Sequence, residues 1–331
     1  MAFLYPLIFF HHFIPSSPLP MSLPTYIAII DLGTNTFHLL LVEIKEGHPH
    51  RIHKESTFVK LAAEGIETIG SAAFARGIEA LDHFSQIIAA YKEVSVFAFG
   101  TAALRTASNG REFMQMAADR CGIKIQLING DKEAELISWG VKQAVSLSSE
   151  VVLIMDIGGG SVEFIFLNNH EIFWKQSYPL GAAVLKRKFH LADGVSAYEN
   201  EELTTFLEIQ LGTLLAMADF FQVKTLIGAS GTFDTLVDLS LAAQDKYRDP
   251  LCLHYEIALD DFTVLKEKLC SLSFEERLAL PGMPADRAEM INGAVLLIAF
   301  VIRYFPIERI IQSEYAIKEG ILWGILNGKI N

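Results

Sequence analysis

Short apolar segments alternate with longer segments of helical spacing along most of the chain. Residues 25–31 (TYIAIID) and 37–44 (FHLLLVEI) have the pattern of strands, and residues 71–91 repeat Ala, Ile and Leu at the spacing of a helix. The same reasoning predicts further strands at 94–100, 123–128, 151–156, 162–167, 171–177 and 224–230, and helices at 111–121, 131–145 and 197–220. The sequence after residue 230 is predicted to be mainly helical. This alternation indicates an α/β fold.

One pattern occurs twice in the chain. YIAIIDLGTNTFHLLLVEI and VVLIMDIGGGSVEFIFLNN both contain an apolar strand, Asp, an apolar residue, Gly, two residues, a hydroxyl residue and an alternating strand. Asp31 and Asp156 are 125 residues apart, which is too long for a solenoid repeat and suits a duplicated domain. We therefore expect two lobes, residues 25–140 and 141–314, with a cleft between their matching hairpins.

The first twenty residues are apolar but do not have the features of a signal peptide. They lack the basic N-terminal region and the small-residue cleavage site of a signal peptide. Their apolar run is also too short to span a bilayer. Met21 lies just before the first predicted strand. We therefore predict that Met21 is the native start and that residues 1–24 are a disordered or mis-assigned extension. Peptides from upstream of Met21, in protein expressed from its own promoter, would contradict this.

Composition limits the classes of partner. A chain of 331 residues that is 51% hydrophobic can form about two domains. Its net charge of −12 argues against a nucleic-acid or anionic-membrane binder, since those ligands require an excess of Lys and Arg. Cys121, Cys252 and Cys270 show neither disulfide nor zinc spacing. A cytoplasmic protein is expected.

The repeated hairpin suits phosphate binding. A tight turn of small residues directs several backbone N–H groups into one concavity, and glycine lets a phosphate approach closely. The hydroxyls of Thr34, Thr36 and Ser161 can donate as well, while Asp31 and Asp156 could hold a hydrated Mg²⁺. Either hairpin alone could be a plain β-turn, but the matched pair favours a phosphate site.

Other glycine-rich phosphate motifs do not fit this sequence. The dinucleotide motif GxGxxG requires glycine at Glu163 and a helix after it, whereas residues 162–167 alternate like a strand. A Walker A loop requires GKS or GKT, and neither triplet occurs. The glycines at 158–160 therefore belong to a strand–turn–strand site.

Seven segments in order resemble the exopolyphosphatase/guanosine pentaphosphate phosphohydrolase family: DLGTNTFHLLLVE, GTAALRTASN, INGDKEAELI, DIGGGSVEF, YPLGAAV, GASGTFDTL and PGMPADRAEMINGA. The resemblance extends from about Tyr26 to the end of the chain and is to the short, two-domain members. It implies two ribonuclease-H-like domains of the actin, sugar-kinase and heat-shock-chaperone fold, with a C-terminal helix at 315–331 joining the first domain.

The resemblance also implies roles for individual residues. Glu133 corresponds to the carboxylate that orients or deprotonates the attacking water, with Glu135 as the alternative, although an acid in the first turn of a helix is also favoured by the helix dipole. Arg105 corresponds to a phosphate-contacting arginine, or it is a surface helix residue. Glu163 corresponds to a second carboxylate near the metal or the water, or it is a solvated acid on the polar face of its strand.

Phosphate contacts are implied for the small residues of three turns, at Gly33, Thr34, Asn35, Thr36, Gly158, Gly159, Gly160, Ser161, Ser230, Gly231 and Thr232. A helix N-cap explains Ser230 equally well. Two positions depart from the family pattern: Val184 stands where an arginine is common, with a basic run at 186–188 after it, and Tyr315 stands where a glycine is common. The basic run could replace the missing charge or form an ordinary solvated helix face. His38 is expected to be a packed or hydrogen-bonded side chain.

The expected activity is removal of the terminal phosphate from inorganic polyphosphate, from guanosine pentaphosphate, or from both. Mg²⁺ near Asp156, Asp31 and Glu163 would assist. The guanosine substrate would connect the protein to the stringent response, and a homodimer is compatible with the family. Two alternatives stay open, a kinase of the same superfamily and a non-catalytic nucleotide or polyphosphate sensor.

Overall fold

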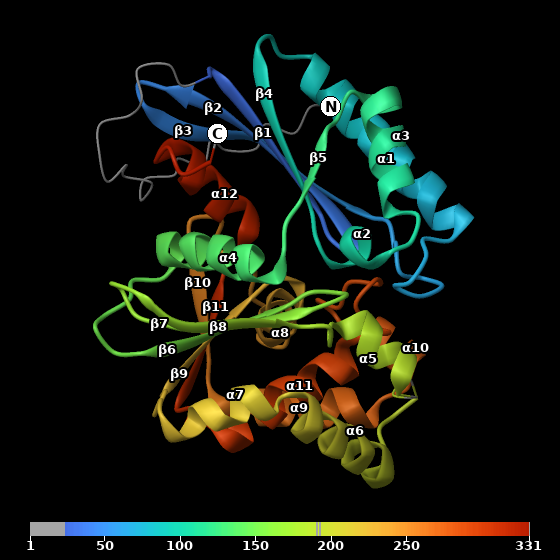
Figure 1. Cartoon of the computed structure of the whole chain (residues 1–331). Coiled ribbons are helices and arrows are strands. Elements are labelled where there is room, and N and C mark those ends of the chain that lie inside the picture. Colours follow the sequence, from blue (N-terminus) through green and yellow to red (C-terminus); the bar gives the residue numbers. More distant parts are fainter. Residues whose placement is uncertain (1–23, 190, 192, 331) are drawn as a thin grey trace. The chain divides into compact units, whose positions relative to one another are not determined.

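The computed structural model describes residues 24–189, 191 and 193–330. The chain divides into unit 1, which ends at Gln143 and resumes at Ile317, and unit 2, Ala144–Ala316 (Figure 1). The predictions for the N-terminal extension and for a start at Met21 fall on residues outside the described range. Within that range no helix combines the length and apolar character required to cross a membrane.

Unit 1 contains a mixed sheet with the strand order β3-β2-β1-β4-β5. β1 pairs antiparallel with β2 and parallel with β4. The strands are β1 Tyr26–Leu32, β2 Thr36–Lys45, β3 His48–Phe58, β4 Val94–Gly100 and β5 Ile125–Leu127. The helices are α1 Ser71–Ala89, α2 Ala102–Thr106, α3 Gly110–Cys121, α4 Gly130–Ala144 and α12 Ile317–Leu326.

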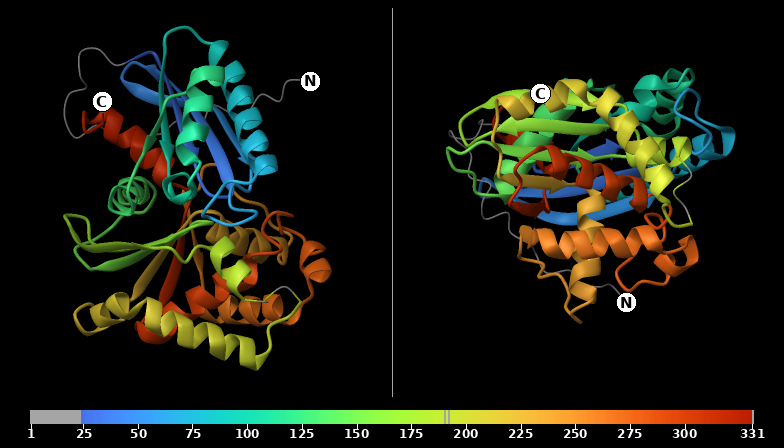
Figure 2. Two further views of the ribbon diagram at one scale, coloured as in Figure 1. Left: turned by 45° about the vertical axis from the view of Figure 1, so that its right-hand side comes forward. Right: turned by 90° about the horizontal axis from the view of Figure 1, so that it is seen from below.

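Helices lie on both faces of this sheet (Figure 2). Ala28, Ile30 and Leu32 of β1 belong to the apolar core formed with α1 and α3. Successive side chains of a strand point to opposite faces, so Asp31 lies on the other face, where α12 packs against β1. A strand covered on both faces must be apolar throughout, which explains the continuous run IAII.

Unit 2 contains a mixed sheet with the strand order β10-β11-β9-β6-β7-β8. Its strands are β6 Val152–Ile157, β7 Val162–Leu167, β8 Ile172–Tyr178, β9 Thr225–Ala229, β10 His254–Ile257 and β11 Arg309–Ser313. Its helices are α5 Ala182–Lys188, α6 Ala197–Gln210, α7 Gly212–Ala216, η1 Met217–Asp219, α8 Gly231–Ala242, α9 Leu259–Ser271, α10 Phe274–Leu278 and α11 Ile291–Tyr304.

The two sheets repeat one topology. In each, a first strand pairs antiparallel with the second and parallel with the fourth, as β6 does with β7 and β9. A further strand extends the parallel side, β5 in unit 1 and β11 in unit 2. The prediction of a duplicated, two-domain α/β fold is confirmed.

One predicted helix is broken in the structure, and three strands were not predicted. The expected helix at 197–220 is interrupted at Leu211, beside a helix-weakening glycine, and continues as α7 and the 3₁₀ turn η1. The region after residue 230 is mainly helical, as predicted, but it also contains two strands, β10 and β11, of four and five residues. Strands this short cannot be distinguished from helix by periodicity. β3 was not predicted, because HPHRIHKESTF is a polar edge strand without a clear apolar face.

Candidate functional site

The two predicted hairpin turns have the same backbone geometry. The N–H of Gly33 donates to the carbonyl of Thr36 at 3.1 Å, and the N–H of Gly158 donates to the carbonyl of Ser161 at 3.0 Å. A Cβ atom on Gly33 would lie 2.9 Å from the Thr36 oxygen, and one on Gly158 would lie 3.2 Å from the Ser161 oxygen. Glycine at this position therefore permits the close approach that forms the turn.

Neighbouring segments hold the carbonyl groups of both turns. The carbonyl of Asn35 accepts from the N–H groups of Val59 and Lys60, both at 2.8 Å. In unit 2 the carbonyls of Gly158 and Gly159 accept from Ala182 and Ala183, at 2.9 and 3.0 Å. In a trans peptide the N–H points opposite to the C=O.

The amides that follow these carbonyls are therefore directed away from the supporting segments. In unit 1 these are the N–H groups of Asn35 and Thr36, because the carbonyl of Thr34 also accepts from Leu61 at 2.8 Å. In unit 2 they are the N–H groups of Gly159 and Gly160. Successive backbone N–H groups with a common direction form a concavity that attracts anions. Both turns thus have the backbone arrangement that a phosphate site requires.

In unit 2 two carboxylates face each other across neighbouring strands. Asp156 of β6 is the direct cross-strand partner of Glu163 of β7, so both side chains lie on the same face of the sheet. Asp156 is 5% and Glu163 is 2% exposed. The hydroxyl of Ser177, on β8, donates to Glu163 Oε1 at 2.6 Å. The alternative that Glu163 is a solvated acid is therefore wrong.

This pair has the chemistry of a partial magnesium site. Two adjacent buried carboxylates supply hard oxygen ligands, and Mg²⁺ commonly takes one or two carboxylates and completes its shell with water and substrate phosphate. Among the residues that the structure describes, no cluster of three or more His, Cys, Asp or Glu side chains is arranged to hold a metal. The protein groups present therefore fit a cation that is only partly coordinated by side chains.

The equivalent positions of unit 1 carry different groups. Asp31 of β1 is the cross-strand partner of His38 of β2, and His38 is the partner of Ser56 of β3. The ring nitrogen Nδ1 of His38 lies 2.7 Å from Ser56 Oγ. His38 is therefore a hydrogen-bonded side chain, as expected.

Glu133 and Arg105 are brought together in unit 1. Glu133 lies in the first turn of α4, and it is 7% exposed, so it is not an exposed acid. Arg105 lies near the end of α2, and its Nη1 donates to the carbonyl of Ile128 at 2.6 Å and to Glu133 Oε2 at 3.4 Å. Glu135, the alternative carboxylate, has a side chain 32% exposed and pairs with Lys132 at 3.1 Å.

The third turn, at the start of α8, contains a strained residue. Ser230 occupies the N-cap position but makes no side-chain capping bond, so the N-cap explanation for its hydroxyl is wrong. Its φ of 67° and ψ of 176° lie in a region that is essentially restricted to glycine, and such residues concentrate at functional sites. Thr232, in the first turn of α8, is buried.

Arg287 is a candidate that the sequence reasoning missed. A Cβ atom on Gly231 would collide with the guanidinium group of Arg287, so this side chain lies directly against the beginning of α8. The signal that could have found it is its place in the motif PGMPADRAEM. A guanidinium beside a helix N-terminus is well suited to contact an anion.

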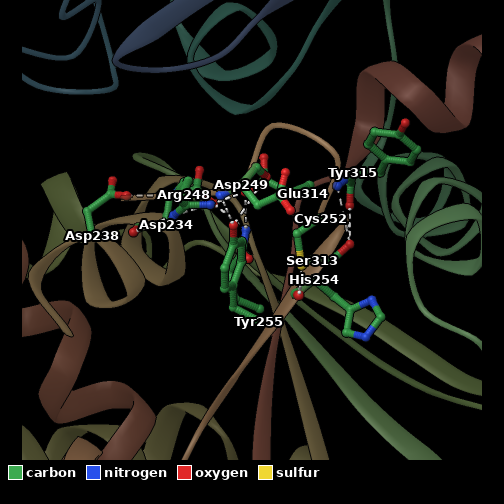
Figure 3. Close-up of polar contacts among 11 residues, drawn as sticks. Asp234, Asp238, Arg248, Asp249, Cys252, His254, Tyr255, Ser313, Glu314 and Tyr315 are labelled. Carbon is green, nitrogen blue, oxygen red and sulfur yellow. Dashed lines mark hydrogen bonds and ion pairs between the residues drawn. The ribbon is translucent and has the colours of Figure 1, made fainter. Parts of the chain in front are cut away.

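A charged network joins α8 to the end of β11 (Figure 3). Arg248 donates to Asp238 Oδ1 at 2.5 Å and to the carbonyl of Asp234 at 2.7 Å, and it also pairs with Glu314. Gln312 of β11 donates to Asp234 Oδ1 at 2.8 Å. The network therefore fixes α8, and with it the turn at Ser230, relative to the segment SEYA that departs from the family pattern.

The lysines of the basic run at residues 186–188 contact other residues of unit 2. Lys186 Nζ lies 2.8 Å from Glu289 Oε2, and Lys188 Nζ lies 4.7 Å from the centroid of the Phe206 ring. A role of these lysines in substrate binding stays a prediction.

Residues 40–329 match the model of the Ppx/GppA phosphatase family. The chain belongs to this family. Among solved Ppx/GppA structures, an exopolyphosphatase from Cytophaga hutchinsonii is 36% identical, with a TM-score of 0.89 over 92% of this chain and 99% of that chain. The Ppx/GppA family member from Aquifex aeolicus is 22% identical, with a TM-score of 0.76 over 91% of this chain and 97% of that chain. The family resemblance of the sequence is confirmed, and the second likeness extends the evidence for the fold.

Proposed function

We propose that this chain is an exopolyphosphatase-type hydrolase that releases orthophosphate from the end of inorganic polyphosphate, of guanosine pentaphosphate, or of both. The observation that carries the proposal is the buried Glu133 beside Arg105 in a chain that repeats a phosphate-binding turn. Further support comes from the Cytophaga hutchinsonii relative, which is named as an exopolyphosphatase.

In the proposed reaction, water attacks the terminal phosphorus in line with the bridging oxygen. One P–O bond forms as the bridging P–O bond breaks, and the electron pair of the broken bond goes to the leaving oxygen of the shortened chain. Glu133 accepts a proton from the water. The guanidinium of Arg105, 3.4 Å from Glu133 Oε2, is close enough to bind the terminal phosphoryl oxygens while orienting the carboxylate.

Phosphate binding is assigned to the three turns. In unit 1 the groups are those of residues 33–36, and in unit 2 those of residues 158–161 and 230–232 together with the guanidinium of Arg287. Backbone amides suit this role because they are rigid donors that do not reorganise during the reaction.

We propose that Asp156 and Glu163 bind Mg²⁺ and that Asp31 is a further ligand of the same ion. When bound, the cation would neutralise phosphate charge. The protein's own contribution is the fixed carboxylate pair, in which the Ser177 hydroxyl orients Glu163 through the 2.6 Å hydrogen bond.

Replacement of Glu133 by Gln tests the proposal. We expect Glu133→Gln to lower phosphate release at least about 100-fold, because the amide cannot accept the proton. The matched control is Glu135→Gln, two residues later on the same helix, whose partner is the partly exposed Lys132. Release should be assayed on long polyphosphate, tripolyphosphate and guanosine pentaphosphate, with and without Mg²⁺, and folding should be checked by circular dichroism.

Several outcomes would overturn parts of the proposal. Near-normal turnover by Glu133→Gln would remove the assigned base, and loss of turnover in Glu135→Gln alone would move that role to Glu135. Transfer of phosphate to a hydroxyl compound rather than to water would identify a kinase. Binding without turnover in the wild-type protein would identify a sensor.

A further inference from the structure

One surface of unit 1 combines two tryptophans with three lysines. The rings of Trp139 on α4 and Trp323 on α12 have centroids 5.0 Å apart. Lys132 Nζ lies 4.6 Å from the Trp139 centroid, and Lys329 Nζ lies 4.7 Å from that of Trp323. Lys142 lies within one turn of Trp139 on α4. We call Lys132, Trp139, Lys142, Trp323 and Lys329 the Lys/Trp surface.

A close crossing of two helices builds this surface. A Cβ atom on Gly320 of α12 would collide with the carbonyl of Leu136 on α4, and one on Gly324 would lie 2.8 Å from the Trp139 ring. Residues four apart share a helix face, so these two glycines form one contact stripe. The stripe brings the helices together, and the paired rings then position the ammonium groups by cation–π attraction.

The surface concentrates positive charge in an acidic chain. The whole sequence has 27 Lys and Arg against 39 Asp and Glu. The acidic residues at the beginning of α4 are Asp131, which is exposed, Glu133, which is buried beside Arg105, and Glu135, which pairs with Lys132 at 3.1 Å. Burial and the charge of Lys329 lower the pKa of Lys142, so two like charges lie near each other. An anion bound between them would relieve that repulsion.

The position of the surface along α4 suggests which anion it binds. Lys132 is next to Glu133, the proposed catalytic base, and Lys142 lies ten residues further along, about 15 Å at the rise of an α-helix. Positive groups spaced along a helix whose first turn contains the proposed catalytic residue suit an extended ligand with repeated negative charge. A short phosphate ester would occupy only the beginning of this path.

We propose that the Lys/Trp surface binds the distal part of an inorganic polyphosphate chain whose terminal phosphate is held at Glu133 and Arg105. The inference rests on the proposed function, and within it selects long inorganic polyphosphate as the substrate class. The tryptophan rings hold the lysine side chains in place, so that less side-chain entropy is lost when the chain binds.

The decisive variant is Lys142→Gln/Lys329→Gln. For this variant we expect the ratio of kcat/KM on long polyphosphate to kcat/KM on tripolyphosphate to fall about tenfold, through a higher KM for the long chain. The salt dependence of long-chain KM should become less steep, because fewer counterions are exchanged on binding. The matched control is Lys92→Gln/Lys124→Gln, which removes two exposed lysines of unit 1 outside this surface and should leave the ratio unchanged.

Fluorescence provides a readout that does not depend on turnover. The chain has three tryptophans, so Trp174→Phe leaves only Trp139 and Trp323 as emitters. In the Glu133→Gln background, long polyphosphate should change their emission at concentrations where tripolyphosphate does not. Adding Lys142→Gln/Lys329→Gln should shift the titration to about tenfold higher polyphosphate.

The outcomes separate this inference from the proposed function. An unchanged ratio in the decisive variant, with normal phosphate release, would overturn the Lys/Trp surface and leave the hydrolase proposal intact. Tighter binding of an oligonucleotide of equal charge would also overturn the assignment, by pointing to nucleic acid. Absence of phosphate release from every phosphoanhydride would overturn the hydrolase instead, while the fluorescence titration would still report whether the surface binds polyphosphate.

Discussion

The turns at residues 33–36 and 158–161 share a backbone geometry but have different side chains beside them. Across three neighbouring strands, unit 1 aligns Asp31, His38 and Ser56, whereas unit 2 aligns Asp156, Glu163 and Ser177. In both units the serine hydroxyl contacts the central residue, at 2.7 and 2.6 Å.

The two sets of three aligned residues differ in the central residue, which is His38 in unit 1 and Glu163 in unit 2. A carboxylate beside an imidazole has much less affinity for a hard cation than two carboxylates have. The two hairpins thus share the backbone geometry that we propose for phosphate binding and differ in the charge beside it. We infer that the main ligands of the cation come from the hairpin of unit 2.

The largest expected effect comes from exchanging the central residues for neutral amides. Glu163→Gln should raise the Mg²⁺ concentration needed for half-maximal phosphate release at least about tenfold, because it removes one of the paired carboxylates. His38→Gln, at the equivalent position of unit 1, should leave that concentration close to its original value. A Mg²⁺ titration of phosphate release measures both, and equal shifts in the two variants would show that the hairpins are not functionally distinct.

The supports of the two turns also differ. The turn of unit 1 rests on the segment at residues 59–61, whereas that of unit 2 rests on the beginning of α5. A Cβ atom on Gly181 would collide with the backbone of Gly159 and Gly160. Gly181→Ala should therefore destabilise unit 2 by about 1–3 kcal/mol and lower its melting temperature by several degrees.

A suitable control for Gly181→Ala is Gly212→Ala in the same unit. No heavy atom lies within 4 Å of the Cβ position of Gly212, and alanine favours a helix over glycine. Calorimetry should show an unchanged or slightly raised melting temperature for this control. An equal loss in both variants would mean that the close contact of α5 with the turn is not what stabilises it.

The smallest expected difference concerns the two serines. Ser177→Ala removes a hydrogen bond to the buried carboxyl group of Glu163 and should cost about 1.5–3 kcal/mol, whereas Ser56→Ala removes a more exposed bond to His38 and should cost about 0.5–1.5 kcal/mol. Thermal unfolding compares them. A larger loss of stability for Ser56→Ala would contradict the view that the serine hydrogen bond of unit 2 is the stronger of the two.

Much of the fold could be predicted from local patterns. The apolar runs that end at Asp31 and Asp156 are long and bounded by turn residues, so they identify the central strands and the duplication. β3, β10 and β11 escaped prediction because β3 is a polar edge strand and the other two are very short. The break in the helix at Leu211 was not predicted because apolar residues continue on both sides of it.

The candidate site could be predicted only in part, because the spacing of residues along the chain does not show which side chains are close together in the folded protein. INGDKEAELI contains two candidate carboxylates, and the sequence offers no physical reason to choose between them without the family resemblance. In the structure Glu133 is buried against Arg105, whereas Glu135 is partly exposed and pairs with Lys132. Arg287 was missed for the same reason, since its contact with Gly231 joins segments 56 residues apart.

The sequence by itself determined the repeated strand–turn–strand, because close backbone approach in a tight turn requires glycine and a strand buried on both faces requires an apolar run. Only the tertiary structure decided the surroundings of each charge. Sheet register placed Glu163 opposite Asp156 and gave it Ser177, while His38 took the equivalent place in unit 1. The crossing of α4 and α12 brought Trp139 together with Lys329 and Trp323, nearly 200 residues later in the chain. Burial and pairing set the chemistry of a charged group, and both depend on long-range packing.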